Sequence, residues 1–374
     1  MTRILAIISL LFLFNYSAPL IEQKLDHTDK VQAIDKIHSE VNIPEIMSAI
    51  GQIFAQVEQL LKQLNLNLEE LPKTPKKEEP IEKIELQTPD KQLFSISNIE
   101  LGQTKEQIEM NVGAAKRSSL NEYGSDWYAY HTNYHNFLMV MYDGNNKASG
   151  VYTDQDLISS ANGIKRGSSK DEVHTILGNP LKQIQKGRYV YQFEEDRDYD
   201  VYLQDNAYVT IFYDKHEGNT VTAMQIIRKD IEDEKTDFYT KASPELKEGF
   251  EYQMFDLTNA ARVNHQLPVL TWDEHVRETA RKHSSDMAVN NYFDHTNLKG
   301  QSPFDRMKED DIIFRLAGEN LAYGQFSSIF AHEGLMNSLG HRENILREGY
   351  RYLGVGVAFN NESHPYYTEN FYAK

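Results

Sequence analysis

A repeat with an offset of 65 residues constrains the middle of this chain to two copies of one structural unit. The segment 102–108 (GQTKEQI) is similar to 167–173 (GSSKDEV), and the same offset relates Gly113 to Gly178. Each copy has a Thr or Ser suited to cap a helix, acidic residues for its first turn, and a glycine that can end it. The repeat therefore predicts two short helices with equivalent caps.

Aromatic-rich segments follow each of these helices. Strands are expected at 127–130 and 137–142 in the first copy and at 189–193 and 208–213 in the second, with turns at 143–145 and 214–218. Residues 95–228 are therefore interpreted as a duplicated α+β domain, called the middle domain below. Its aromatic side chains are expected to fill a core, and we recognise no catalytic constellation among them.

The first 92 residues form three segments of different composition. Residues 1–18 have a basic start and an apolar run from Ile4 to Phe14, typical of a signal peptide and shorter than a bilayer span. An uncleaved N-terminal anchor is the alternative, because Tyr16 stands where a small residue is preferred before cleavage. Residues 22–71 carry an apolar stripe at helical spacing and are expected to form an amphipathic helix. Residues 72–92, rich in Pro, Lys and Glu, are expected to be an extended linker.

Charge and cysteine content limit the classes of partner and chemistry. The net charge of −17 disfavours nucleic acid and anionic membrane surfaces as main partners. The chain has no cysteine, which excludes disulfides, thiolate metal ligands and a cysteine nucleophile. If the chain is exported, packing alone must stabilise it.

Helical and strand patterns alternate in the last third of the chain. Apolar residues at helical spacing predict a first helix, and three further helices are expected to begin after Asp273, Ser302 and Ser327, the last of them closing at Gly340. The second of these helices places His283 on its inner face, where a core position is expected. Alternating residues near 353–359 and 366–370 predict two antiparallel strands. Helices that cover a small antiparallel sheet satisfy this pattern, so the fold class is α+β.

Three short pieces of this region carry side chains with catalytic or ligand chemistry. They are 293–295 (FDH), 318–320 (GEN) and 338–342 (SLGHR), which contain His295, Glu319 and His341. Two imidazoles and a carboxylate can bind a divalent metal or transfer protons. We expect the three side chains to meet in one cleft after folding.

The order of these pieces and of several others resembles the CAP superfamily (cysteine-rich secretory proteins, antigen 5 and pathogenesis-related 1) of bacterial type. The matching motifs lie between residues 250 and 372 and include 259–262 (NAAR), 267–273 (LPVLTWD), 303–306 (PFDR) and 366–371 (YYTENF). The resemblance implies an α-β-α sandwich over 244–374. The middle domain is similar to the CAP-associated N-terminal domain of bacterial CAP proteins.

The resemblance also implies a tetrad of two His and two Glu in a surface cleft. By motif, His295, Glu319 and His341 take three of its places, and the resemblance makes them candidate ligands for a divalent metal such as zinc. Ser338 stands where the second Glu is expected, and the nearby Glu333 has the wrong offset. Three ligands and a water would still make an open metal site.

Two classes of function remain open from the sequence. One is an exported bacterial protein, secreted or anchored through its N-terminus, that acts as a binding or assembly module at the cell envelope or spore surface. Its ligand would be an envelope protein, a glycan or a lipid. The other is a metal-dependent hydrolase, for example a peptidase, with Glu319 as ligand or general base and the histidines as ligands. A purely structural interaction protein is a third interpretation.

Overall fold

The computed structural model describes residues 83–374. The expected signal segment 1–18, the amphipathic segment 22–71 and the linker up to residue 82 lie outside the described residues. The last part of the expected linker is attached to the middle domain: the backbone N–H groups of Lys91 and Gln92 donate to Glu100, and that of Gln87 donates to Asn98. In residues 83–374, none of the helices has both the length and the apolar character needed to cross a bilayer.

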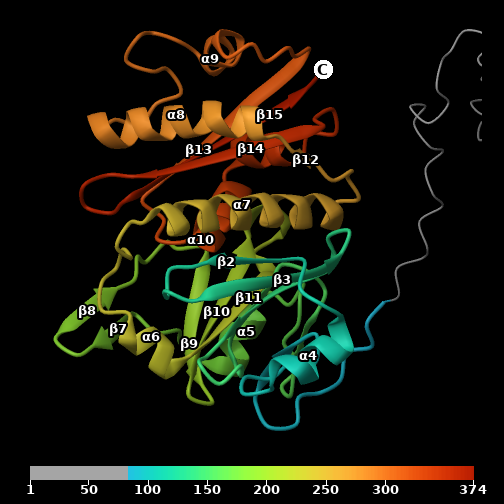
Figure 1. Cartoon of the computed structure of the whole chain (residues 1–374). Helices are drawn as coiled ribbons and strands as arrows, with labels where there is room; N and C mark the ends of the chain where they lie inside the picture. Colours follow the sequence, from blue (N-terminus) through green and yellow to red (C-terminus); the bar gives the residue numbers. More distant parts are fainter. Residues whose placement is uncertain (1–82) are drawn as a thin grey trace, which may run out of the picture. The chain divides into compact units, whose positions relative to one another are not determined.

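The middle domain is built on a seven-stranded antiparallel sheet of order β2-β3-β4-β5-β11-β10-β9 (Figure 1). The strands of this sheet are β2 (Arg117–Leu120), β3 (Asp126–Thr132), β4 (His135–Tyr142), β5 (Ala148–Thr153), β9 (Tyr199–Gln204), β10 (Ala207–Asp214) and β11 (Thr220–Arg228). Two smaller sheets pair β1 (Phe94–Ile96) with β6 (Ile158–Ser160), and β7 (Gln183–Lys186) with β8 (Tyr189–Gln192).

The two repeated helices have equivalent ends. Helix α4 (Lys105–Val112) is capped by Thr104, and α5 (Lys170–Leu177) is capped by Ser169; each cap side chain accepts a hydrogen bond from the backbone N–H three residues ahead. Each helix ends at a glycine with positive φ, 80° at Gly113 and 78° at Gly178. Local capping chemistry therefore places both helices where the repeat predicts them.

The aromatic segment 189–193 contains the strand β8, as expected. This strand does not join the main sheet but forms the separate β7–β8 hairpin, in which Tyr189 and Val190 are exposed. The strand that pairs with β10 is β9 instead. An aromatic run predicts a strand but not its partner, because pairing depends on non-local contacts.

The two faces of the seven-stranded sheet are both covered. Side chains such as Val140 and Ile211 point to the face that packs against Ile108 of α4 and Val173 of α5. Their neighbours on the other face, including Met139 and Phe212, share a buried cluster with Leu257, Ala260 and Ile329 of the C-terminal domain. The middle and C-terminal domains therefore share one continuous core.

The charge run 230–235, which follows β11, is largely helical. Residues Lys229–Glu234 form helix α6, and Glu232 makes an ion pair with the ammonium of Lys186, whose side chain is buried. The tyrosine hydroxyl of Tyr123 donates to the same carboxylate over 2.6 Å. Glu232 therefore joins α6 to the β7–β8 hairpin and to the loop after β2.

The C-terminal domain has a four-stranded sheet of order β12-β14-β15-β13. Its strands are β12 (Thr271–Trp272), β13 (Leu316–Tyr323), β14 (Tyr352–Phe359) and β15 (Pro365–Ala373), and its helices are α7 (Pro244–Asn264), α8 (Glu274–Asn290), α9 (Pro303–Glu309), α10 (Ser328–Asn337) and α11 (Leu339–Ile345). Asp273, Ser302 and Ser327 cap α8, α9 and α10, which confirms the three predicted helix starts.

The predicted end of the last of these helices was wrong. Helix α10 ends at Asn337, and Gly340 lies inside the short helix α11. The break occurs at Ser338, whose extended backbone (φ −99°, ψ 115°) starts a new helix direction. Gly340 has no positive φ, so the glycine is not needed as a stop there.

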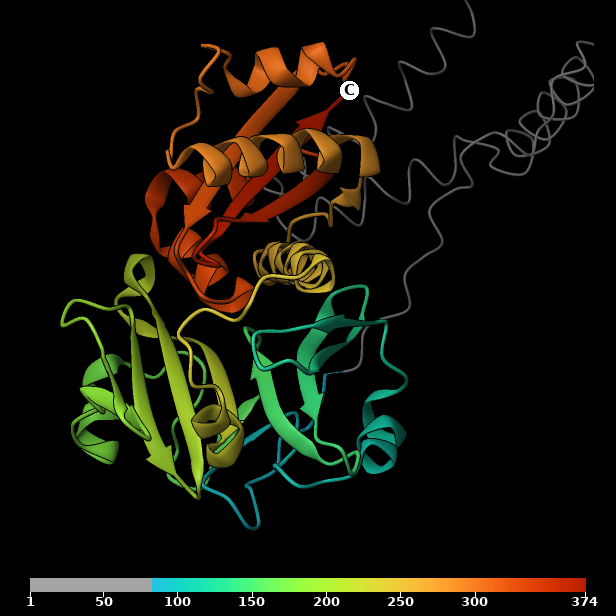
Figure 2. The ribbon, with the colours of Figure 1, turned by 60° about the vertical axis from the view of Figure 1, so that its left-hand side comes forward.

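Helices cover both faces of this sheet (Figure 1). Gly354 and Gly356 of β14 face α8 so closely that an added Cβ would lie 2.2 Å from the backbone nitrogen of Arg277 and 2.1 Å from that of Arg281. The alternate residues Val355 and Val357 share a core with Phe250 and other residues of α7. Figure 2 shows α7 nearly end-on, between this sheet and the middle domain.

Candidate functional site

His295 and Glu319 form a hydrogen-bonded pair at the surface of the C-terminal domain. Glu319 lies on β13 with its side chain 1% exposed, whereas the side chain of His295, between α8 and α9, is 52% exposed. The distance from Nδ1 of His295 to Oε1 of Glu319 is 2.9 Å. The second carboxylate oxygen of Glu319 accepts from Nη2 of Arg306 over 2.6 Å. The buried carboxylate is therefore held between an imidazole and a guanidinium.

Arg306 is a site residue that the sequence did not assign. Besides Glu319, its guanidinium donates to the carbonyls of His295, over 2.7 Å, and Gln301. It is buried on α9, a helix that begins with the Ser302 and Asp305 capping box. Its place in the matched motif 303–306 was visible in the sequence, but only the fold shows that it neutralises Glu319.

His341 lies beside this pair, on α11. Its Nδ1 is 2.8 Å from the hydroxyl oxygen of Ser338, and its carbonyl accepts from Asn320 over 3.2 Å. Asn344 of the same helix donates to the carbonyl of Glu319 over 3.2 Å, so α11 packs beside the strand that carries Glu319. The structure thus brings His295, Glu319 and His341 together from three separate elements.

The two histidines have opposite protonation preferences. The hydrogen bond to Glu319 raises the pKa of His295 above its ordinary value. Burial, together with the charge of His295, lowers the pKa of His341. These shifts favour the charged form of His295 and the neutral form of His341, an arrangement that offers both a hydrogen-bond donor and an acceptor.

A buried polar network supports the two strands and α11 beneath the site. The amide of Asn344 donates to the carbonyl of Glu319 and to Oδ1 of Asn320, over 3.2 and 3.1 Å. Asn320 in turn donates to Glu369, which also accepts from Thr258 over 2.7 Å. Burial raises the pKa of Glu369 to about 7. Neither Thr258 nor Glu369 was assigned from the sequence, although Glu369 belongs to the matched motif 366–371.

His283 braces the loop that carries His295. It is 1% exposed, as its inner-face position predicted, and its Nε2 lies 3.0 Å from the carbonyl oxygen of Asp294. Burial lowers the pKa of His283, which favours the neutral ring that donates to this carbonyl. His283 and Arg306 also line a polar pocket of about 370 Å³ next to the site.

Neither candidate for the fourth tetrad place supplies a carboxylate here. Ser338 is the hydrogen-bond partner of His341. Glu333 faces the middle domain, where it accepts from the hydroxyl of Tyr152 over 2.6 Å. Burial raises the pKa of Glu333 to about 8. Glu333 is therefore an interface residue.

The donor set does not fit the metal site that the sequence suggested. Arg306, a permanent cation, lies 2.6 Å from Glu319, and Nδ1 of His341 faces Ser338. Within residues 83–374, no three His, Asp or Glu side chains are grouped so that they could hold a metal ion. Zinc bound by His295, Glu319 and His341 is therefore not supported, and no step through a metal is derived.

Arg342 links the site to the middle domain. Its guanidinium donates to Asp214, the last residue of β10, over 2.8 Å and to the carbonyl of Met336 over 3.4 Å. Nearby, Asn337 donates to the carbonyl of Tyr213 and accepts from the backbone of Lys215. Arg342 thus contacts the segment before His341, but its closest partner, Asp214, belongs to the other domain.

Comparison with known proteins agrees with this geometry. Residues 101–238 match the family model described as CAP-associated N-terminal, and residues 255–371 match that of the cysteine-rich secretory protein family. The chain is 30% identical to the uncharacterized membrane protein YlbC of Bacillus subtilis over 72% of this chain and 82% of that protein. It is 40% identical to the uncharacterized protein YkwD of the same organism over 38% of this chain and 53% of that protein.

Two solved structures share the fold. An extracellular protein with an SCP domain from Bacillus anthracis has a TM-score of 0.65 and 24% identity, covering 80% of this chain and all of that one (100%). A cysteine-rich secretory protein from Staphylococcus aureus has a TM-score of 0.59 and 16% identity, covering 77% of this chain and 98% of that one. Both alignments are long enough to include the middle and the C-terminal domains.

Proposed function

The chain belongs to the cysteine-rich secretory protein (CAP) family, in its bacterial form with a CAP-associated N-terminal domain, and on this premise we propose that it is a non-enzymatic binding or assembly module outside the cytoplasm. The extracellular protein among its structural neighbours supports this location. The proposal includes export by residues 1–18, either as a secreted form or as one anchored in the membrane. Its partner belongs to the cell envelope or spore surface.

The pairing of Glu319 with Arg306 is the observation that carries this proposal. Both oxygens of the Glu319 carboxylate already have partners, Arg306 at 2.6 Å and His295 at 2.9 Å. The family's second glutamate is replaced by Ser338, which cannot supply a negative charge. The carboxylate of the site is therefore committed to internal contacts, whereas the two imidazoles retain hydrogen-bonding groups suited to recognition.

Exposed apolar side chains next to the two histidines also support a binding role. Phe293, two residues before His295, is 49% exposed, and Leu339, two residues before His341, is 60% exposed. Tyr323 at the end of β13 lies 5.9 Å from Phe293 between ring centroids. Apolar groups around polar ones are typical of a surface that binds a protein, glycan or lipid.

The test is retention of envelope components on the immobilised full chain. Extracted envelope proteins, cell-wall glycan and lipid vesicles form three separate arms. Leu339→Ser should reduce retention in the arm that binds, whereas Met110→Ser, an equally drastic change at a residue 78% exposed on α4, should not. The full chain is needed because separating the domains would expose their shared core.

A parallel assay addresses the hydrolase alternative. The same protein is incubated with peptide, ester and glycan substrates, together with Glu319→Gln. Hydrolysis by the wild type that disappears in Glu319→Gln, at an unchanged melting temperature, would overturn the proposal. Retention in none of the three arms would also count against it.

A further inference from the structure

A polar pocket lies between α8 and α9, beside the histidine site, and is called the α8–α9 pocket below. Its volume is about 370 Å³, within the size range of small-molecule sites. Helix α8 contributes four lining residues that share one polar face, at spacings of three and four: Thr279, Lys282, His283 and Asp286. The loop 297–301, Arg306 of α9 and the end of that helix complete the walls.

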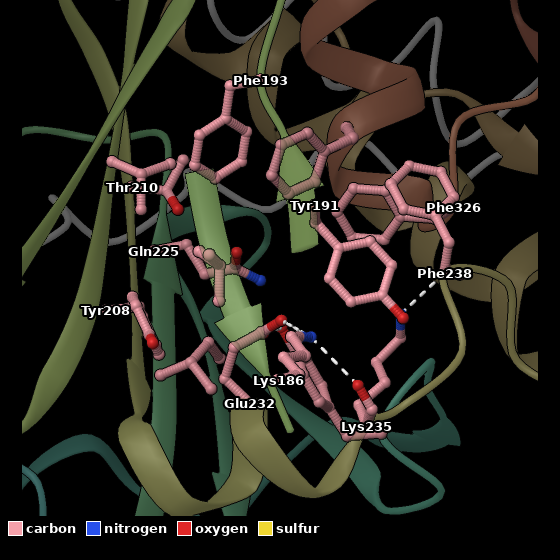
Figure 3. Close-up of a pocket in the computed structure, with 15 residues that line it drawn as sticks. Lys186, Tyr191, Phe193, Tyr208, Thr210, Gln225, Glu232, Lys235, Phe238 and Phe326 are labelled. Atoms are coloured by element: carbon pink, nitrogen blue, oxygen red, sulfur yellow. Dashed lines mark hydrogen bonds and ion pairs between the residues drawn. The ribbon is translucent and has the colours of Figure 1, made fainter. Parts of the chain in front are cut away.

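The aromatic pocket under the β7–β8 hairpin offers much less room (Figure 3). Rings such as those of Tyr191, Phe238 and Phe326 line it, and about 60 Å³ remains free, far below the size of small-molecule sites. Its charged side chains Lys186 and Glu232 already pair with each other. Of these two pockets, the α8–α9 pocket is therefore the one with room for a ligand.

The loop that forms one wall of the α8–α9 pocket is held by its own hydrogen bonds. Oδ1 of Asn297 accepts from the backbone N–H groups of Lys299 and Gln301, over 3.1 and 2.9 Å. Arg306 donates to the carbonyl of Gln301 over 3.0 Å, and Gly300 adopts the positive φ of 77° that the turn requires. Because this wall is already ordered, a ligand loses little affinity to ordering it.

Two buried residues of the pocket each have a polar atom without a partner. His283 and Arg306 are only 1% and 6% exposed, and neither Nδ1 of His283 nor Nε of Arg306 makes a hydrogen bond within the described part of the chain. Nε2 of His283 lies 3.0 Å from the carbonyl oxygen of Asp294, so this nitrogen carries the hydrogen. Burial lowers the pKa of His283 and favours the neutral ring, which leaves Nδ1 as an acceptor. The walls therefore contain an unused donor and an unused acceptor.

A hydroxyl group is complementary to this combination, because it can donate and accept hydrogen bonds at once. Buried polar groups without partners cost free energy, so a ligand that pairs with them gains affinity. An apolar ligand would leave both Nε of Arg306 and Nδ1 of His283 unpaired. The two groups therefore favour a ligand that carries hydroxyls.

The charges that line the pocket balance. Asp310 pairs with the ammonium of Lys282 over 2.6 Å and accepts from Thr279, and Glu309 accepts from the amide of Gln301. The charged lining residues are three cations and three anions: Lys282, Lys299 and Arg306, and Asp286, Glu309 and Asp310. A neutral ligand leaves this balance undisturbed, whereas an anion or a cation would disturb it.

From these groups we propose that the α8–α9 pocket binds one neutral sugar ring of an envelope glycan. Hydroxyls of the sugar accept from Nε of Arg306 and donate to Nδ1 of His283. Among envelope components, a saccharide combines a compact ring, several hydroxyls and no charge. The inference rests on the proposed function for the choice of an envelope component, and it names the chemical class of that component.

The test uses the full chain and N-acetylglucosamine as probe, with isothermal titration calorimetry as readout. N-cyclohexylacetamide has a ring of the same size and the same acetamido group but no hydroxyl, and we expect it to bind at least about tenfold more weakly. N-acetylglucosamine 6-phosphate adds negative charge to the same sugar. We expect it to bind no more tightly than N-acetylglucosamine, because the pocket has no excess positive charge.

His283→Gln tests the acceptor. The glutamine amide can still donate to the carbonyl of Asp294, whereas no acceptor remains at the position of Nδ1. We expect binding of N-acetylglucosamine to weaken about tenfold at a nearly unchanged melting temperature. His275→Gln is the control, because His275 is exposed on the same helix and lies outside the pocket, so affinity should stay unchanged.

Absence of N-acetylglucosamine binding to the folded wild type overturns the proposal, and is the result expected if only water pairs with these groups. Equal affinity for the sugar and N-cyclohexylacetamide also overturns it, as does equal affinity of the wild type and His283→Gln. Tighter binding of the phosphate would assign the pocket to an anion instead. If His283→Gln does not fold, the comparison of the three probes still decides.

The outcome is distinguishable from failure of the proposed function. Retention of envelope components is measured with Leu339→Ser, whereas sugar binding is measured in solution with His283→Gln. Loss of sugar binding with retention intact overturns only the assignment of the α8–α9 pocket. Sugar binding without retention overturns only the role of the surface around Leu339.

Discussion

Arg342 of the C-terminal domain and Asp214 of the middle domain form an ion pair of 2.8 Å, with side chains only 11% and 7% exposed. Arg342 follows His341 directly on α11. Asp214 also accepts from the backbone N–H groups of His216 and Glu217, which holds the turn after β10. The geometry of the histidine site is thus connected to the sheet of the other domain through adjacent residues.

Replacing Arg342 tests this connection. Arg342→Met leaves the buried carboxylate of Asp214 unpaired, and removal of one partner of a buried ion pair typically costs about 3–5 kcal/mol. We expect a loss toward the lower end of that range, measured by urea unfolding. Arg315→Met is the control, because Arg315 is exposed and should tolerate the change. An equal effect of the two substitutions would show that the ion pair adds nothing.

The interface between the domains is also tested by a glycine of α7. A Cβ at Gly249 would lie 2.1 Å from the carbonyl oxygen of Leu120 on β2, so Gly249→Ala must push the domains apart. We expect a loss of about 1–3 kcal/mol, as for other overpacked sites. At Gly334 in α10 a Cβ meets nothing within 4 Å, so Gly334→Ala should be neutral or slightly stabilising. Thermal unfolding of both variants decides whether the close contact exists in solution.

The pKa of Glu333 makes stability depend on pH. Burial raises this pKa from 4.5 to about 8, so the neutral carboxyl is favoured in the folded state. Its contribution is complete below pH 4.5 and is lost as the pH rises toward 8. Asp154, with a pKa raised to about 7 by burial, contributes a loss of the same sign.

Glu333→Gln should therefore flatten this alkaline loss. The glutamine oxygen can still accept from Tyr152, and no buried charge forms. We expect the variant to melt at least about 2 °C above the wild type at pH 8 and to differ little at pH 4.5. Glu362→Gln, at a side chain 76% exposed, is the control and should show no such pH-dependent gain. A constant difference at both pH values would contradict the assigned pKa.

The two histidines of the site should titrate separately. His295 is expected to lose its proton above pH 6.5 and His341 below it, as followed by NMR of the imidazole C–H signals. The raised pKa of His295 means that its contribution to stability is full below pH 6.5 and is lost as the pH rises through the folded-state pKa. Glu319→Gln removes the carboxylate and should return His295 toward 6.5. An unchanged His295 in that variant would show that another group raises its pKa.

Local features of the fold were predictable from the sequence. The caps at Thr104, Ser169 and Asp273 follow from side chains that bond to backbone groups a few residues away. The segment 189–193 was expected to be a strand and contains one, but spacing along the chain does not encode that this strand pairs with β7 outside the main sheet. Gly340 was taken for a helix end, whereas the break lies at Ser338.

In the candidate site, too, motifs identified the residues, whereas only the fold showed their contacts. His295, Glu319 and His341 were identified by motif, and the structure brings them together. The role of Arg306 was missed because a guanidinium 13 positions from Glu319 meets it only when α9 packs against β13. The metal interpretation required a free carboxylate oxygen of Glu319 as a ligand. The contact with Arg306 engages that oxygen.

The sequence by itself determined the family, the α+β class, the repeated capped helices and the three side chains of the site, because these depend on local chemistry and on motif order. Only the tertiary structure decided that the two domains share a core, that Glu333 and Arg342 face the middle domain, and that Arg306 pairs with Glu319. The physical reason is that burial, charge pairing and close backbone contact arise between residues far apart in the chain. Those contacts set which polar groups are already satisfied and which are left to bind a ligand.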